Sequence, residues 1–146
     1  MKSAVSKSAN DAIDSLELAL LSKFKEQECP LNHSFFDGIY VRECVLFAGM
    51  IVTSKIHLKK HPYVVLKGKA EVWIENVGWH LIEAPYFGTT QAGTRRVLRI
   101  IEDIHWITFH SNPDDTEDLD LIESRIIEPH QNDLLNNIYS QQIENE

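Results

Sequence analysis

The chain has 146 residues, of which 43% are hydrophobic and 25% charged, and its formal net charge is −8. This length and composition suit one domain with appended ends and a sizeable hydrophobic core. The acidic balance argues against binding to a nucleic-acid polymer, which needs a broad basic face, but a small basic pocket inside an acidic shell would concentrate anionic ligands.

Three features of the sequence predict a cytoplasmic protein with no membrane partner. The N-terminus does not show the basic, apolar and small-residue succession of a signal peptide. No apolar run approaches the roughly 18 residues of a membrane span. Cys29 and Cys44 fit neither a zinc site nor a disulfide framework, so we expect both to be reduced thiols.

The N-terminal segment, residues 1–32, is predicted to contain a polar tail and one helix. Apolar residues recur at helical spacing between Asn10 or Asp11, either of which suits an N-cap, and about Glu26. Two interpretations are open for this helix. It packs on the outside of the domain, or its wide apolar stripe forms a dimer contact.

The central segment, residues 33–112, shows short alternating runs that are typical of a β-barrel or sandwich. We predict strands at residues 39–47, 70–75, 79–83, 95–101 and 104–110. Asn76 and Gly78 indicate a hairpin, and Glu102-Asp103 a tight turn between the last two strands. Because strands do not alternate with helices, a parallel α/β sheet is not expected.

The C-terminal segment, residues 113–146, is predicted to be a helical extension. Asp114 or Thr116 suits the N-cap of a short helix that ends near Ser124. Residues 125–128 would add an edge strand, and a weak apolar period predicts a second helix over residues 129–146.

The most informative stretch is residues 49–68, which we interpret as two strands that meet at a polar corner. In the first strand Lys55 and His57 point the same way, because successive side chains alternate across a strand. His61 keeps this parity, although Pro62 favours a bend. Three groups that can carry positive charge on one face of a strand predict a ligand site.

This spacing resembles the first motif of the cupin family, in which Gly is followed by His-x-His, an acidic residue and a second Gly. Gly49, Lys55, His57, His61 and Gly68 stand at those positions, and Gln91 to Arg96 resemble the second motif in outline. The resemblance covers residues 38–111. It implies a mainly β fold: a small cupin-type β-barrel, or double-stranded β-helix, with an N-terminal helix and a short helical C-terminal extension.

The chain departs from the family at the metal ligands. A metal-binding cupin places three His and one Glu at the positions that hold Lys55, His57, His61 and Arg96 here. Lys and Arg are hydrogen-bond donors only and do not ligate a metal while protonated. The resemblance therefore implies a barrel whose metal site is lost or rebuilt, with no cofactor.

The chain also resembles small cupin-domain proteins encoded by bacteriophages, which show similar Lys-Ile-His and Gly-Thr-x-Arg segments and a Tyr-x-Arg-Glu segment. That segment corresponds to Tyr40, Arg42 and Glu43 here. It implies that Arg42 lines the same cavity as His57. The alternative from the residues alone is a surface Arg42 in a salt bridge.

We predict that Lys55, His57, His61, Arg96, Arg42 and Tyr40 bind a small anionic ligand, such as a phosphate, a nucleotide or a carboxylate. A phage-like accessory protein of this kind would sequester a host signal in the host cytoplasm, without catalysis, and would form a homo-oligomer, most simply a dimer.

Three alternatives stay open. A divalent transition metal would use His57 and His61 with a third ligand from His80, His105, His110, Glu43 or Glu71. A cupin-like isomerase or epimerase would use a His base on a sugar or small acid. An interaction module would use only the terminal helices.

Overall fold

The computed structural model describes residues 5–26, 29–128 and 138–143. Its helices are α1 (Lys7–Lys23) and α2 (Leu119–Ile126). Its strands are β1 (Phe24–Glu26), β2 (Leu31–Phe36), β3 (Ile39–Leu46), β4 (Met50–Thr53), β5 (His61–Ile74), β6 (Gly78–Glu83), β7 (Tyr86–Thr90), β8 (Arg96–Ser111) and β9 (Ile138–Ile143). None of the described helices is long and apolar enough to cross a lipid bilayer.

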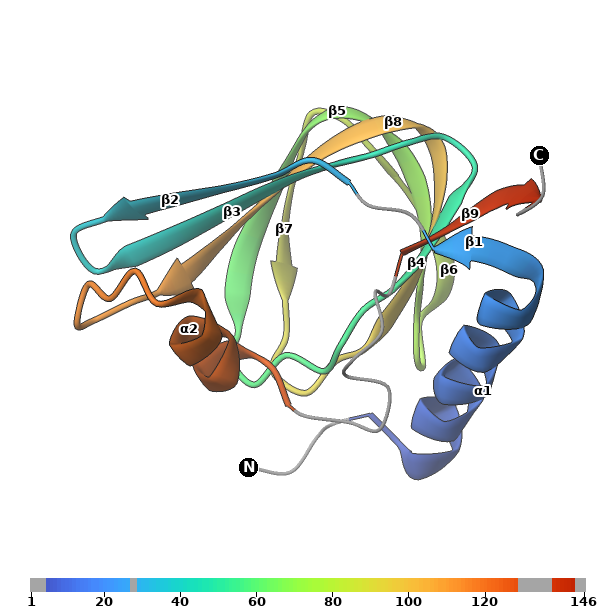
Figure 1. The fold of residues 1–146 in the computed structure, drawn as a ribbon, viewed down its shortest axis with the longest axis horizontal. Coiled ribbons are helices and arrows are strands. Elements are labelled where there is room, and N and C mark those ends of the chain that lie inside the picture. The colour runs from blue at the N-terminus through green and yellow to red at the C-terminus, as the bar shows by residue number, and fades with distance from the viewer. Residues whose placement is uncertain (1–4, 27–28, 129–137, 144–146) are drawn as a thin grey trace.

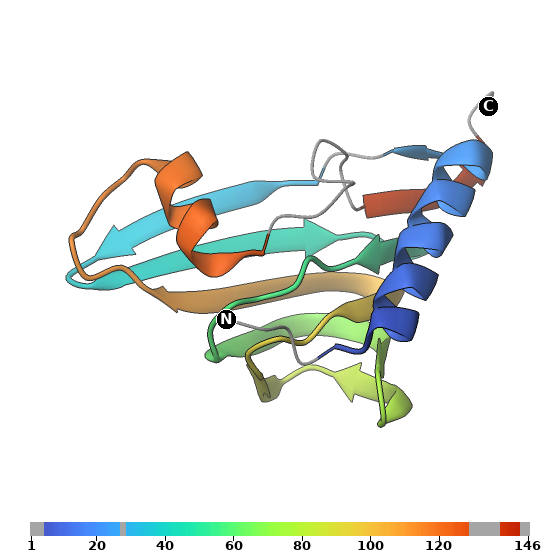
Figure 2. The ribbon, with the colours of Figure 1, turned by 90° about the horizontal axis from the view of Figure 1, so that it is seen from below.

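The strands curl into a barrel around β5 and β8, the two longest strands (Figure 1). Strand β8 pairs with β3, β4 and β5, while β5 also pairs with β6 and β7, and every one of these pairs is antiparallel. Helix α1 lies along one end of the barrel and α2 lies at the other (Figures 1 and 2). The predicted mainly β barrel with an N-terminal helix and a short C-terminal helix is confirmed.

Two predicted local features are confirmed at the level of the backbone. Strand β3 follows the alternating run that begins at Ile39, and β5 and β6 join through the predicted hairpin. Asn76 and Gly78 adopt φ angles of 67° and 83°, which Asn and Gly reach most readily. Both cysteines are free thiols, and burial raises the pKa of Cys29 to about 11.

The predicted turn at Glu102-Asp103 is wrong, because β8 runs without interruption through both residues. The chain bends there instead of reversing, and the register of β5 shifts opposite the bend, between Val65 and Ala70. Gly68 has φ +93°, and a Cβ at this position would collide with the backbone oxygen of Asp103. The exposed pair Glu102-Asp103 is therefore the outside of a shared strand bend, which has the same polar composition as a turn.

Helix α1 begins and ends about three residues before its predicted bounds, and Phe24–Glu26 form strand β1, which pairs with β9. Ile13 and Leu20 are buried within the single chain. This agrees with the interpretation in which the helix packs on the outside of the domain.

A buried ion cluster fastens α1 to the barrel. The Arg95 side chain is fully buried; its Nη1 donates to Asp14 Oδ1 at 2.6 Å and to Asn10 Oδ1 at 2.7 Å. Its Nη2 forms an ion pair with the fully buried Glu17 at 3.1 Å, without the alignment of a hydrogen bond. Glu17 also accepts a hydrogen bond from Thr53 Oγ1 at 2.7 Å.

The C-terminal segment differs from its prediction in three ways. Asp118, not Asp114 or Thr116, caps α2 by accepting hydrogen bonds from the backbone N–H groups of Asp120 and Leu121. The helix continues through Ile126, so only an isolated antiparallel bridge between Ile127 and His57 remains of the edge strand predicted at residues 125–128.

Residues 138–143 form strand β9 on β4, not a helix. The sequence Ile-Tyr at residues 138–139 suits a strand, and the free edge of β4 supplies the backbone partners. The rest of the helix predicted for residues 129–146 lies outside the described residues.

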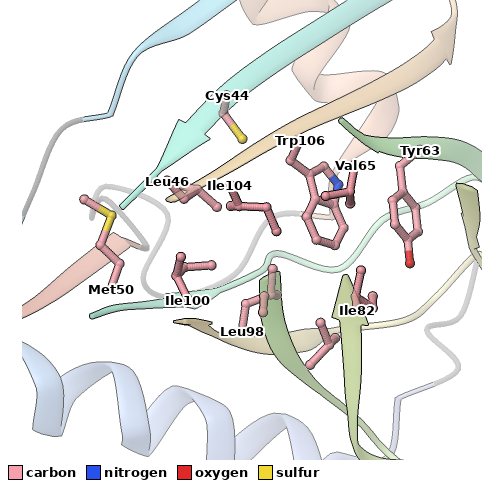
Figure 3. Close-up of a cluster of buried hydrophobic side chains, with 12 residues drawn as sticks. Cys44, Leu46, Met50, Tyr63, Val65, Ile82, Leu98, Ile100, Ile104 and Trp106 are labelled. Atoms are coloured by element: carbon pink, nitrogen blue, oxygen red, sulfur yellow. The ribbon is translucent and has the colours of Figure 1, made fainter. Parts of the chain in front are cut away.

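The hydrophobic core fills the barrel beside α1 (Figure 3). Val65, Ala70, Val72 and Ile82 are completely buried in it, and the rings of Tyr63 and Trp106 stack at 4.6 Å with an angle of 14°. This packing leaves the α2 end of the barrel less filled.

Candidate functional site

A cavity of about 550 Å³ lies inside the barrel between β3, β4, β5, β8 and α2. The register of β3 on β8 brings its wall together, because residues directly opposite each other on paired strands share a face. Tyr40 pairs with His110 and Arg42 with Thr108, and all four line the cavity. Trp106 lines it as well and connects it to the hydrophobic core.

All six residues predicted to bind the ligand line this one cavity: Lys55, His57, His61, Arg96, Arg42 and Tyr40. The alternative of Arg42 as a surface residue in a salt bridge is not what the structure shows. Among the described residues Arg42 has no carboxylate partner, and it faces the cavity from β3.

The predicted strand that carries Lys55 and His57 is wrong, because β4 ends at Thr53. Thr53, Ser54 and Lys55 line the cavity as consecutive residues, which a regular strand does not allow. The irregular segment is held by other contacts. Ser54 Oγ accepts a hydrogen bond from the backbone N–H of Arg96 at 2.7 Å, and His57 forms an isolated bridge with Ile127.

Three imidazoles meet in the cavity, of which the sequence predicted two. The ring centroids of His57 and His61 lie 4.8 Å apart, those of His61 and His110 4.4 Å, and those of His57 and His110 6.5 Å. Burial, followed by the other two imidazoles and by Arg96 and Arg42, lowers the pKa of His57 to about 3. Burial, His61 and Arg42 lower the pKa of His110 to about 3.

His61 is neutral for the same physical reason and has a defined tautomer. Burial lowers its pKa, and Arg96 adds to this effect, although the hydrogen bond to Lys59 opposes it. Nδ1 of His61 lies 3.1 Å from the carbonyl oxygen of Lys59, which only accepts, so Nδ1 carries the proton. Nε2 of His61 therefore keeps its lone pair.

Arg96 is the buried cation of the cavity. The residue is 7% exposed, its Nη2 donates to the carbonyl oxygen of Thr89 at 3.2 Å, and its guanidinium carbon lies 5.0 Å from the centroid of the Tyr63 ring. Its Nε is buried and has no hydrogen-bond partner among the described residues, which also offer it no carboxylate. A buried cation in this state favours an incoming anion.

The cavity also contains polar residues outside the predicted ligand-binding set, among them His33, Thr108 and His110, the last of which the sequence predicts only as a possible metal ligand. His33 lies in β2, where its Nδ1 forms a hydrogen bond with the Tyr40 hydroxyl at 2.7 Å. His110 and Thr108 share a face of β8 with Trp106, and their Nε2 and Oγ1 atoms lie 2.9 Å apart. Strand alternation along β8 indicates that His110 and Thr108 share a face with Trp106. Their position opposite Tyr40 and Arg42 in the cavity depends on the register of β3 on β8, which the local sequence does not give.

The cavity does not fit the metal site of a cupin. Of the predicted third metal ligands only His110 lines the cavity. His105 is hydrogen-bonded to Glu43 at 2.9 Å, and Glu71 forms an ion pair with Arg99. Arg96 stands near His57 and His61 and repels a cation. Among the described residues no three His, Cys, Asp or Glu side chains are arranged to hold a metal ion.

Acidification is expected to destabilise the protein through its buried imidazoles. Their folded pKa values lie below the value of about 6.5 in the unfolded chain, so their stability contribution is full above that pH and is lost as the pH falls toward 3. Between about pH 7 and pH 5 the loss is about 2 kcal/mol for each of His57 and His110. Urea unfolding at several pH values measures it.

The matched variant for this measurement is His110→Gln, which keeps a polar side chain but does not titrate. The fall in unfolding free energy between about pH 7 and pH 5 should shrink in this variant by the share of one imidazole. An unchanged pH slope would show that His110 is protonated in the folded protein as readily as in the unfolded chain.

No family model and no curated protein sequence matches the chain. Solved structures do match it. A protein with a double-stranded β-helix domain from Klebsiella pneumoniae has a TM-score of 0.50 and 12% identity over 66% of this chain and 84% of its own. The Cupin_2 domain of an XRE family transcriptional regulator from Enterobacter cloacae has a TM-score of 0.50 and 17% identity over 60% and 99%.

A cupin superfamily protein from Desulfitobacterium hafniense is similar to the same extent, with a TM-score of 0.50 and 11% identity over 65% of this chain and 87% of its own. At these identities the likeness concerns the fold alone. The barrel is the double-stranded β-helix of cupin proteins, as the two motifs predicted.

Proposed function

We propose that this cupin-fold chain binds a small anionic molecule, such as a phosphate, a nucleotide or a carboxylate, inside its barrel. The observation that carries the proposal is Arg96, a guanidinium buried to all but 7% with no carboxylate beside it and with an Nε that lacks a partner among the described residues. A guanidinium is a planar fork that matches the oxygens of a phosphate or carboxylate.

The remaining cavity wall supports an anion. Arg42 and Lys55 add positive charge, and the three imidazoles are uncharged near neutral pH, so they offer both donors and acceptors. The volume of about 550 Å³ lies within the range of small-molecule sites. The net charge of −8 over the whole chain keeps polyanions away while the cavity attracts one small anion.

The biological part of the proposal is sequestration in the cytoplasm. The resemblance to small bacteriophage proteins supports a host nucleotide signal as the ligand, and a binding protein without catalysis needs no further residues. A dimer remains our prediction for the oligomeric state.

Thermal unfolding with a panel of ligands tests the binding proposal. We expect the melting temperature to rise with mononucleotides or sugar phosphates, because a ligand at 100 times its Kd stabilises the folded state by about 2.7 kcal/mol. Neutral nucleosides and sugars of the same shape are the controls and should give no rise. Equal rises in melting temperature with an anionic compound and its neutral counterpart would contradict the proposal, and so would the absence of a rise with every anion.

The tautomer of His61 favours a second candidate, an isomerase or epimerase. A neutral imidazole whose Nε2 keeps its lone pair can take a proton from a carbon beside the anionic group that Arg96 holds. Such a reaction exchanges a substrate hydrogen with solvent deuterium, which NMR of each binding ligand detects. Ligands that bind but never exchange argue for binding alone. Elemental analysis of the purified protein tests the metal alternative.

A further inference from the structure

Helix α2 forms one side of the cavity mouth and carries two acidic residues there. Asp120 and Glu123, which we call the acidic lip, line the cavity beside the apolar residues Ile122 and Ile126 of the same helix. Both acidic residues are exposed to solvent. Figure 1 shows α2 next to the end of β8, away from α1.

The acidic lip is held in place by the backbone around α2. The N–H of Leu58 donates to the carbonyl oxygen of Ile126 at 2.7 Å, and the N–H of Glu128 donates to that of Ile56 at 2.9 Å. Arg125 binds Asp114 through both guanidinium nitrogens at 2.8 and 2.9 Å. The two carboxylates therefore stand at a fixed side of the cavity mouth and do not belong to a loose loop.

The electrostatic influence of the acidic lip reaches the cavity. Glu123 Oε1 lies 3.4 Å from Lys55 Nζ, and the Lys55 side chain is only 17% exposed. Burial raises the pKa of Tyr40; Arg42 opposes this rise and the Glu123 carboxylate adds to it. A site that recognised only an anion would gain from neutral or basic residues at these two positions, since each carboxylate weakens the attraction.

The cavity thus has two poles of opposite charge. Arg96, whose Nε has no hydrogen-bond partner among the described residues, and Arg42 form the cationic pole within the barrel. The acidic lip forms the anionic pole at the α2 side, where Lys55 pairs with Glu123. Specificity arises when each charged group of a ligand meets its complement and the wrong ligand leaves one unmatched.

We infer that the ligand is zwitterionic, with an anionic group that Arg96 binds and an amino group that Glu123 and Asp120 bind at the mouth of the cavity. This inference rests on the proposed function, because it names the second group of the same ligand. It assigns the site to amino-bearing anions, such as amino sugar phosphates, in preference to anions that carry hydroxyl groups alone.

Calorimetry at about pH 7 with glucosamine 6-phosphate and glucose 6-phosphate tests the inference, since the two differ only in an amino group and a hydroxyl group. We expect the full chain to bind the amino compound more tightly by roughly two- to fivefold, the range of a partly exposed ion pair. Glu123→Gln should remove most of this preference, and it should tighten glucose 6-phosphate, because one like charge is gone. The double variant with Asp120→Asn should abolish the preference.

Glu117→Gln is the matched control, because it makes the same change on the loop before α2 at an exposed residue that does not line the cavity. It should keep the full preference. Equal binding of both sugar phosphates by the unchanged chain would overturn the inference and leave anion binding standing. A preference that survives in Glu123→Gln with Asp120→Asn would overturn it as well. If neither sugar phosphate binds, the inference is overturned, and the melting-temperature panel with nucleotides and other anions decides separately whether the proposed function stands.

Discussion

Replacing Arg95 with methionine is expected to lower the free energy of unfolding by about 3–5 kcal/mol, the cost of breaking a buried ion pair from one side. The change removes the cation that pairs with the carboxylates of Asp14 and Glu17, and the Glu17 side chain is fully buried. It also removes the hydrogen bonds from Arg95 Nη1 to α1. Urea unfolding followed by fluorescence measures the loss.

Arg99→Met is the matched control, because Arg99 forms its ion pair with Glu71 on the outside of the barrel and is 56% exposed. Exposed pairs contribute less than about 1 kcal/mol, so this variant should unfold almost like the unchanged chain. Adding Glu17→Gln to Arg95→Met should recover part of the stability, because a neutral amide then replaces the buried carboxylate that lost its ion pair with Arg95. Equal losses in Arg95→Met and Arg99→Met would contradict the buried cluster.

Replacing Arg96 with glutamine is expected to weaken binding of any ligand that stabilises the chain in the anion panel by roughly 10- to 100-fold. The glutamine keeps hydrogen-bonding capacity but loses the charge and the fork of the guanidinium. Arg96→Lys keeps the charge alone and should lose less affinity. Isothermal calorimetry gives the dissociation constants, and unfolding curves confirm that each variant is folded.

Arg99→Gln supplies the comparison for Arg96→Gln, since it removes one positive charge from the same strand on the outer side of the barrel. It should leave the dissociation constant within about twofold, because exposed charges are screened by salt. If Arg99→Gln weakens binding as much as Arg96→Gln, the ligand responds to overall charge and not to the cavity.

Much of the barrel could be predicted from the sequence, because strand alternation and hairpin turns are visible within a few consecutive residues. The alternation that begins at Ile39 and the Asn76 to Gly78 hairpin depend on a few neighbouring residues, and both are found in the structure. The turn predicted at Glu102-Asp103 is wrong because a pair of polar residues is typical both of a turn and of the exposed side of a strand bend. Only the close approach of Gly68 to Asp103 separates the two, and that approach joins residues far apart in sequence.

The six predicted ligand-binding residues line one cavity, but a regular strand is not what brings Lys55 and His57 there. Lys55 and His57 were placed by strand alternation, but β4 ends at Thr53 and an irregular segment carries them inward. His110 could not be placed from its own strand, since its position opposite Tyr40 depends on the register of β3.

Arg95 and Arg96 are adjacent in the sequence but make different contacts. Arg95 forms an ion pair with Glu17 of α1, and Arg96 lines the cavity. The resemblance to the second cupin motif marked Arg96. The burial of Arg95 depends on the docking of a helix some eighty residues earlier in the sequence, as the separation of 81 positions from Asp14 shows. Contacts of this kind are set by tertiary packing and leave no local pattern.

If the cavity binds an anion as we propose, the anion sits inside the barrel on Arg96. Crystals of the full chain soaked with tungstate, an electron-dense oxyanion that scatters anomalously, test it most directly. We predict an anomalous peak within the cavity, with an oxygen at hydrogen-bond distance from Arg96 Nε, and no such peak in crystals of Arg96→Gln. A peak confined to surface lysines such as Lys59 and Lys60, with an empty cavity in the same crystal, would contradict the account.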